Sequence, residues 1–184
     1  MAISYQLIRS RRKTIGIQVK GERVIVHAPL RSAGEVINRF VSENETWIQK
    51  QLAKNAALQR RAEAQGILSE GDINALTEKA KQILPARVAY YAKKIGVTYG
   101  RVTIRRQQTK WGSCSSKGNL NFNCLIMLAP IEVIDSIIVH ELCHRKEMNH
   151  SDRFYAEVYK AYPEYDKWHE WLTENGPIIM RRAG

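Results

Sequence analysis

The chain has 184 residues, of which 44% are hydrophobic and 26% are charged. This composition predicts a folded globular chain and excludes disordered, collagen-like and disulfide-scaffold classes. The 29 lysines and arginines outnumber the 18 acidic residues, and the resulting formal net charge of +11 favours a polyanionic partner such as nucleic acid or a membrane surface.

The sequence also indicates the cellular compartment in which the protein is expected. The first residues lack the apolar stretch of a signal peptide, and the longest uncharged apolar run, residues 124–131, is too short to span a bilayer. The three cysteines have no CxxC spacing, which favours reduced thiols over a disulfide framework. We therefore expect a cytoplasmic protein that does not enter a membrane.

The positive charge is concentrated in the first third of the chain. Residues 1–61 hold 12 lysines and arginines and 4 acidic residues, a net charge of +8, whereas residues 62–184 hold 17 and 14, a net charge of +3. Any polyanion is therefore expected to bind through residues 1–61.

This first third predicts a basic strand and helix module over residues 1–66. Expected strands cover residues 3–8, 14–20 and 23–27, and Gly21 and Glu22 give the last two hairpin spacing. Ser32 and Glu35 form a capping-box pattern, after which the apolar spacing predicts one long helix to about residue 64.

Residues 67–184 predict a second domain of the α+β class. The expected elements are a helix over residues 72–95, strands over 98–106 and 119–128 joined by a turn at 111–118, and helices that begin near Ile131, Ser151 and Pro163, the last ending before Gly176. We expect a small antiparallel sheet packed against these helices.

The strongest chemical signal is the sequence His-Glu-Leu-Cys-His at residues 140–144, an H-E-x-x-H pattern. On a helix, His140 and His144 lie on one face, so both imidazoles can bind one ion, and Glu141 can deprotonate a water bound to it. The alternative, histidines with only structural partners, is disfavoured by this spacing. Cys143 points to another face and is expected in the core rather than in the metal site.

His150 is the expected third metal ligand. A continuous helix would rotate it roughly 120° away from His144, so the helix must end first. Asn149, in the left-handed conformation, is the expected helix terminator. Three histidines and an open position fit a catalytic Zn²⁺ with Glu141 as general base, because structural zinc sites prefer four protein ligands with cysteines among them.

Stabilisation of the oxyanion requires a further group. The nearest candidates in the sequence are Lys110, Tyr155 and Tyr159, although each of them is more often a structural residue. Separately, the alternating Asn119, Asn121 and Asn123 predict one face of a strand, which is either an edge strand that pairs with an extended peptide or a plain buried strand.

These residues amount to a family resemblance. The segment from Lys110 to Phe154, which contains KWGSCSSKGNLNFNC and VIDSIIVHELCHRKEMNHSDRF, together with RSRRKTIGIQVK near the start, resembles the YgjP-like metal-dependent hydrolase family, which is related to WLM and SprT-type zinc metallopeptidases. The resemblance implies a zincin-like catalytic domain with zinc on His140, His144 and His150 and with Glu141 as general base. The expected function is a zinc-dependent metallopeptidase whose partner is a peptide or protein substrate.

Two alternatives stay open at the level of the sequence. The resemblance also allows a metal-dependent nucleotide (UTP) pyrophosphatase, for which Arg9, Arg11, Arg12 and Lys13 are the residues that can hold a triphosphate. The basic residues 1–61 equally allow a nucleic-acid-associated protein in which zinc is only structural.

Overall fold

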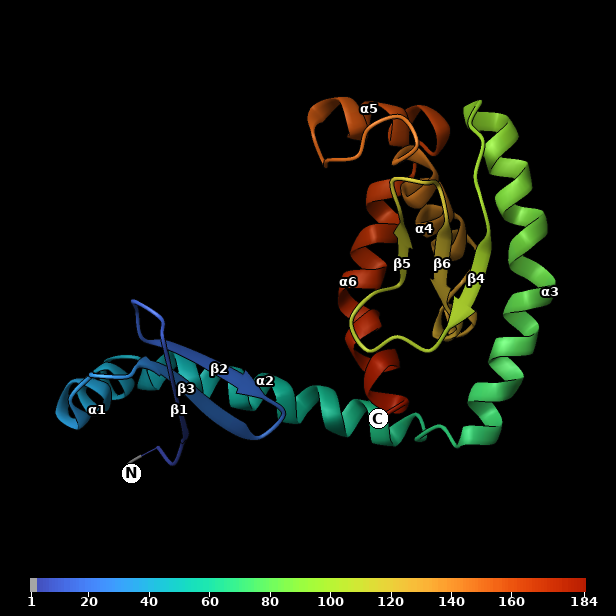
Figure 1. The fold of residues 1–184 in the computed structure, drawn as a ribbon. Helices are drawn as coiled ribbons and strands as arrows, with labels where there is room; N and C mark the ends of the chain where they lie inside the picture. Colours follow the sequence, from blue (N-terminus) through green and yellow to red (C-terminus); the bar gives the residue numbers. More distant parts are fainter. Residues whose placement is uncertain (1–2) are drawn as a thin grey trace. The chain divides into compact units, whose positions relative to one another are not determined.

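The computed structural model describes residues 3–184 (Figure 1). The chain forms two compact units, Met1–Ala64 and Gln65–Gly184. Both combine a three-stranded sheet with helices, so the predicted α+β class is confirmed. None of the helices in the described range combines the length and apolarity needed to cross a membrane.

The first unit contains a three-stranded sheet and two helices. Strands β1 (Gln6–Ser10), β2 (Gly16–Lys20) and β3 (Arg23–Pro29) lie in the order β1-β3-β2, followed by helices α1 (Gly34–Glu43) and α2 (Glu45–Ala64). Strands β2 and β3 form the expected antiparallel hairpin, whereas β1 pairs parallel with β3. Alternate residues of β3, Val24, Val26 and Ala28, are buried and form one core cluster with Ile37, Val41 and Ile48 of the two helices.

Two expectations for this unit are wrong. The single long helix is divided at Asn44, whose side-chain amide donates to the carbonyl of Phe40 and thereby competes with helix continuation. The Ser32–Glu35 capping box is not formed, because helix α1 has Ala33 at its N-cap and no side-chain cap.

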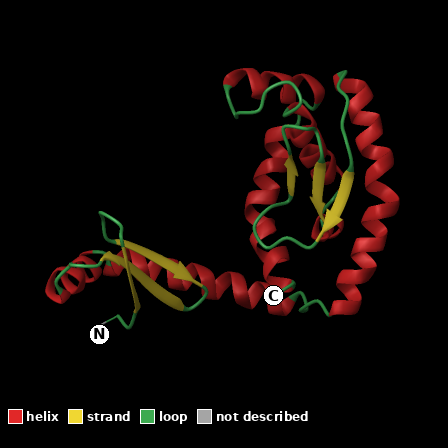
Figure 2. Ribbon diagram, viewed as in Figure 1, coloured by secondary structure: helices red, strands yellow, loops and turns green. Residues whose placement is uncertain are grey.

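The second unit is built around one sheet. Helix α3 (Glu70–Ile95) precedes strands β4 (Val102–Arg105), β5 (Gly112–Cys114) and β6 (Leu120–Asn123), a 3₁₀-helix η1 (Cys124–Leu128), and helices α4 (Ile131–Cys143), α5 (Asp152–Ala161) and α6 (Tyr165–Arg182). The sheet order is β4-β6-β5. Strand β4 pairs parallel and β5 antiparallel with β6, so the sheet is mixed rather than wholly antiparallel. Figure 2 shows helix α4 behind this sheet, with α6 and α3 flanking it in the view.

Helix α4 is the central helix of the second unit. Ten of its 13 residues are buried, which is the signature of a core helix rather than a surface helix. Its apolar residues share one cluster with Leu120 and Phe122 of β6 and with Leu84 and Val88 of α3. The last turn of α4 is therefore held rigidly, and this turn carries the H-E-x-x-H residues.

The boundaries of several elements differ from the expectation. The segment expected as a turn contains strand β5, and the strand expected to reach residue 128 ends at Asn123, whose side chain accepts a hydrogen bond from the backbone of Leu125 and begins the 3₁₀ turn. Helix α6 continues through Gly176 to Arg182. Gly176 lies inside this helix rather than at its end, and it makes room for Trp111, since a Cβ there would lie 3.1 Å from the indole.

Candidate metal centre

Three histidine side chains converge at the end of helix α4. Their ring centroids are 5.1 Å apart for His140 and His144, 5.0 Å for His140 and His150, and 4.8 Å for His144 and His150. The three candidate ligand atoms all lie within 4.8 Å of one another. The Nε2 atoms of His140 and His150 are 3.0 Å apart. The structure thus brings together the three residues that the sequence proposes as ligands.

His150 reaches the other two because the helix ends early. Helix α4 stops at Cys143, and tight i to i+3 hydrogen bonds from Arg145 and Lys146 follow. The Arg145 guanidinium also donates to the carbonyls of Thr98 and Ser116 and fixes the direction in which the chain leaves the helix. The expected left-handed Asn149 is wrong, since no non-glycine residue in the described range has a positive φ.

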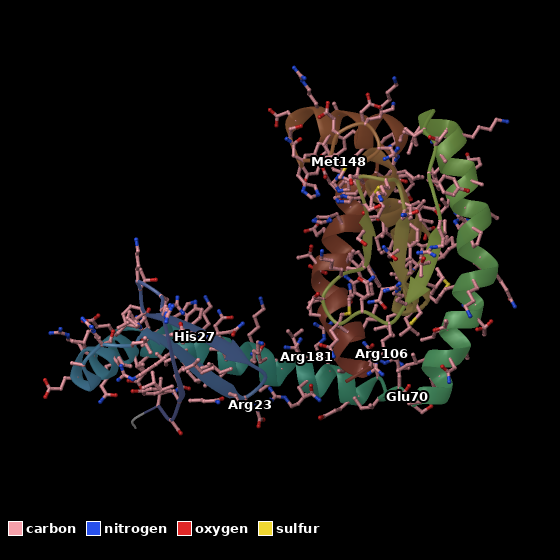
Figure 3. The ribbon with its side chains drawn as sticks, viewed as in Figure 1. Arg23, His27, Glu70, Arg106, Met148 and Arg181 are labelled. Atoms are coloured by element: carbon pink, nitrogen blue, oxygen red, sulfur yellow. The ribbon has the colours of Figure 1, made fainter. Side chains whose placement is uncertain are left out.

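The segment that follows returns His150 to the site. Met148, labelled in Figure 3, marks this segment between α4 and α5 and is exposed. Ser151 then caps helix α5 by accepting a hydrogen bond from the amide of Phe154. The Phe154 ring lies 4.5 Å from that of His144 and about equally close to the other two histidines, so a buried aromatic ring supports all three.

The hydrogen bonds of the histidines fit a metal ion. His144 Nδ1 lies 3.1 Å from the backbone carbonyl of Glu147, which can only accept, so this nitrogen carries the proton and Nε2 presents a lone pair. His140 Nδ1 lies 2.8 Å from the hydroxyl of Tyr165, which can accept the hydrogen of Nδ1 and so leave the Nε2 lone pair for the centre. Ligating histidines characteristically pair their other ring nitrogen in this way.

The protonation states fit as well. Burial, and then the neighbouring His144 and His150, lower the pKa of His140 to about 3. Burial also lowers the pKa of His144. The neutral imidazole, which is the form that binds metals, is therefore favoured at neutral pH. Three imidazole donors suit zinc or a similar divalent transition metal.

Glu141 lies beside the histidines and is only 7% exposed. Burial raises its pKa to about 7, an effect that the charge of Lys110 and a hydrogen bond from the Cys114 backbone partly oppose. A carboxyl group with a pKa near neutrality can both accept and return a proton under physiological conditions, as a general base requires.

A cavity of about 220 Å³ opens next to Glu141 and His140. Its other lining residues come from the segment around β5 and from helices α4 and α6: Thr109, Lys110, Trp111, Gly112, Ser136, Ile137, Tyr165, His169 and Leu172. The site thus has a hollow in which a substrate group can meet the carboxylate.

The comparison with known families decides the identity of the chain. The family described as "YgjP-like, metallopeptidase domain" matches residues 13–73 and 72–175. The chain belongs to this family. Because the family is defined by a metallopeptidase domain, this YgjP-like chain carries the domain of a metal-dependent hydrolase.

Two solved structures are similar to the YgjP-like chain over half its length. The metallopeptidase zymogen abylysin of Pyrococcus abyssi is 23% identical, with a TM-score of 0.46, and the match covers 50% of this chain and 94% of abylysin. The zymogen jannalysin of Methanocaldococcus jannaschii is 21% identical, with a TM-score of 0.45 and the same coverage. No curated protein matches the sequence.

The other sequence candidates in this YgjP-like chain are spread more widely. Lys110 lines the cavity, whereas Tyr155 and Tyr159 are not among its lining residues. The hydroxyl of Tyr159 donates instead to Asp166, at 3.0 Å. Cys143 is fully buried in the core.

The edge-strand interpretation of the asparagines is wrong. Strand β6 is the central strand of its sheet, and Asn123 is fully buried. Its side-chain amide donates to the carbonyls of Gln107 and Lys110, so it shapes the loop that lines the cavity. The edges of the sheet are β4 and β5.

Sequence reasoning missed several residues that line the cavity, among them Trp111, Gly112, Tyr165 and His169. Only Tyr165 and His169 are marked by a pattern in the local sequence. They are four residues apart on an expected helix and therefore share a face, as His140 and His144 do. Nothing local indicated that this face meets the metal centre.

Proposed function

We propose that this chain is a zinc-dependent metallopeptidase in which His140, His144 and His150 bind the metal and Glu141 is the general base. The observation that carries the proposal is the placement of one buried carboxylate beside three converging imidazoles and at the wall of a cavity. When bound, zinc would supply Lewis acidity, which polarises a carbonyl and lowers the pKa of water.

The residues of the chain perform the remaining steps. Glu141 accepts the proton of the attacking water and can transfer it to the leaving amine, because a carboxyl group with a pKa raised to about 7 can both take up and release a proton near neutral pH. Lys110 is the one lysine or arginine among the residues that line the cavity, and its positive charge can complement negative charge that develops on the carbonyl oxygen.

The position of β5 at an edge of the sheet supports a peptide as substrate. Strand β5 is an edge strand and passes directly over Glu141, since a Cβ at Gly112 would touch that side chain. An extended peptide that adds to this edge gains backbone hydrogen bonds and places its carbonyl groups near the carboxylate.

The proposal is tested with the zinc-loaded chain and a fluorogenic peptide library. Glu141→Gln keeps the shape of the side chain and removes its basicity. We expect it to retain zinc and to lose about 100-fold or more of kcat. Glu157→Gln, on helix α5 and paired with Lys146 outside the cavity, serves as the control and should keep full activity. Full activity in Glu141→Gln would exclude this residue as the base.

The nucleotide alternative is tested on the same sample. Of the four cations that could hold a triphosphate, Arg9 already donates to the carbonyls of Pro29, Leu30 and Ser32. We expect peptide cleavage without release of pyrophosphate from UTP. Pyrophosphate release that Glu141→Gln abolishes would instead favour the nucleotide reaction.

A second proposal concerns the partner of the first unit: residues 1–61 bind nucleic acid. The favouring observation is that none of the ion pairs among the described residues involves this region, despite its 12 lysines and arginines. Its positive charge is therefore available to phosphates.

Charge reversal tests this second proposal. Changing Lys50 and Lys54 on α2 to glutamate should weaken binding to a DNA duplex and reduce the salt slope by about 0.9 for each phosphate that the variant no longer neutralises. The matched control reverses Lys93 and Lys94 on α3 and should bind as the wild type does. Absent or salt-independent binding by the wild type would contradict the proposal.

A further inference from the structure

Helix α6 places two aromatic side chains directly behind the metal centre. Tyr165 and His169 lie one turn apart and both line the cavity that contains Glu141. Tyr165 is only 4% exposed. Its hydroxyl lies 2.8 Å from His140 Nδ1 and 3.5 Å from His169 Nδ1, so it connects a proposed metal ligand to a histidine outside the ligand set.

The rings are aligned as well as the polar atoms. Tyr165 stacks on His140 with an interplanar angle of 17° and on His169 with an angle of 19°. The three rings therefore form one stack from the ligand to the cavity wall. The ring centroids are 6.0 Å apart for Tyr165 and His140 and 5.4 Å for Tyr165 and His169, and aromatic pairs at such separations add packing energy that helps to hold the rings in place.

The direction of the hydrogen bonds follows from the chemistry of the ligand. When His140 donates its Nε2 lone pair to a metal, its Nδ1 carries a hydrogen, and the Tyr165 oxygen must accept it. The hydroxyl hydrogen of Tyr165 is then available to an acceptor, and His169 Nδ1 is the partner that the structure provides. The hydrogen bonds therefore point away from the metal: His140 donates to Tyr165, and Tyr165 donates to His169.

We propose that Tyr165 is a positioning residue that orients His140 for metal binding, and that His169 acts on the same ligand through the Tyr165 hydroxyl. The proposal rests on the metal site of the proposed function and assigns two further residues to its support. Partners of this kind typically contribute about 10- to 100-fold to metal affinity.

The alternative is that Tyr165 only packs in the core. The variant Tyr165→Phe separates the two roles, because it keeps the ring and removes the hydroxyl. Tyr91→Phe is the matched control: Tyr91 is also buried, and its hydroxyl donates to Asp135, away from the histidines. If Tyr165 has only a structural role, both variants should lose thermal stability and neither should lose affinity for the metal.

The readout is the affinity for Zn²⁺, measured by competition with a chromophoric chelator. We expect Tyr165→Phe to bind Zn²⁺ about 10- to 100-fold more weakly than the wild type, and Tyr91→Phe to bind it unchanged. Wild-type affinity in Tyr165→Phe would overturn the positioning role.

A double-mutant cycle tests the relay from His169. His169→Phe keeps the stack and removes the acceptor, so it should weaken binding less than Tyr165→Phe does. Because His169 acts through the hydroxyl, adding His169→Phe to Tyr165→Phe should cause no further loss. Additive losses would overturn the relay. If Tyr165→Phe does not fold, unchanged affinity in His169→Phe alone overturns it.

One further variant separates this proposal from the one on which it rests. His140→Ala removes the ligand itself and should abolish high-affinity binding. If the wild type and His140→Ala bind Zn²⁺ with the same affinity, the proposed metal site is refuted, and so is the relay that depends on it. If His140→Ala loses the metal and Tyr165→Phe does not, the metal site stands and only the relay is wrong.

Discussion

Gly112 on strand β5 lies against Glu141 on helix α4 so closely that a Cβ at residue 112 would be 2.7 Å from both Cγ and Oε1 of the glutamate. No side chain other than hydrogen fits there while Glu141 keeps its place. The glycine thus allows the edge strand to pass directly over the proposed base, and the close approach defines where the carboxylate can be.

Gly112→Ala is therefore expected to displace Glu141 and to lower kcat by about 100-fold, the cost of a shift of about 1 Å in a reacting group. Metal content should be unchanged, because the three atoms nearest to that Cβ all belong to Glu141 rather than to a histidine. Gly71→Ala is the control, since a Cβ there meets only Ser69 Oγ at 3.5 Å. Peptide hydrolysis and metal analysis of both variants check the prediction, and an active Gly112→Ala would contradict it.

The raised pKa of Glu141 predicts a pH-dependent stability in the metal-free chain. Burial moves this pKa from 4.5 to about 7. The folded state therefore favours the protonated form, and the stability it contributes is complete below pH 4.5 and is lost as the pH rises to about 7. The loss amounts to about 3 kcal/mol.

Glu141→Gln cannot ionise, so without metal it should be more stable than the wild type by about 3 kcal/mol at pH 8, with no difference below pH 4.5. Urea unfolding in the presence of a chelator measures this difference. His140 contributes with the opposite sign, because stability is lost as the pH falls from 6.5 towards its lowered value, but this term is common to both chains. Equal stability of the two chains at pH 8 would contradict the prediction.

The part of the site that follows from local spacing was predictable. His140 and Glu141 occupy a helix that local sequence indicates: Pro130 marks its start, and the spacing of its apolar residues marks its buried face. The proximity of His150 was predictable only as a requirement of the chemistry. The turn that achieves it depends on Arg145 bonding to Thr98 and Ser116, which are remote in the sequence.

Tertiary contacts account for the errors. Gly176 and Pro177 are helix-breaking residues by local rules, yet helix α6 continues through both, and Gly176 instead gives Trp111 the space to pack against the helix. Strand β5 has the sequence Gly-Ser-Cys, which has little strand propensity, and it forms because β6 offers a partner. Tyr165 joins the site only because helix α6 packs on α4, a contact that no local pattern records.

The cysteines should differ in reactivity. Burial raises the pKa of Cys143 to about 12. Burial first, and then the negative charge of Glu141, raise the pKa of the half-buried Cys114. In the native metal-free chain, iodoacetamide should modify Cys114 slowly and leave Cys143 and the buried Cys124 unmodified.

The variant Glu141→Gln is the control for this experiment, because it removes the negative charge that raises the pKa of Cys114. In Glu141→Gln the like charge beside the Cys114 thiolate is absent, so its pKa should fall and alkylation at about pH 8 should be faster. Mass spectrometry of peptides from both chains identifies the modified residue. Faster labelling of Cys143 than of Cys114 would contradict the burial assignment.

The orientation of helix α4 depends on a buried ion pair at its centre. Asp135 is 5% exposed and accepts hydrogen bonds from two nitrogens of the Arg87 guanidinium and from the Tyr91 hydroxyl, both on helix α3. Arg87→Met leaves the carboxylate buried with a single partner and should lower the free energy of unfolding by about 3–5 kcal/mol. Urea unfolding of the second unit within the full chain measures the loss.

The cost of Arg87→Met arises from the uncompensated charge rather than from the missing pair, so the double variant Arg87→Met, Asp135→Leu should recover most of the stability. Lys81→Met provides the exposed control: its pair with Glu78 has side chains that are 55% and 66% exposed, and its loss should cost at most about 1 kcal/mol. If Arg87→Met were as mild as Lys81→Met, the ion pair would not anchor α4. If the double variant were no more stable than Arg87→Met alone, packing rather than buried charge would account for the loss.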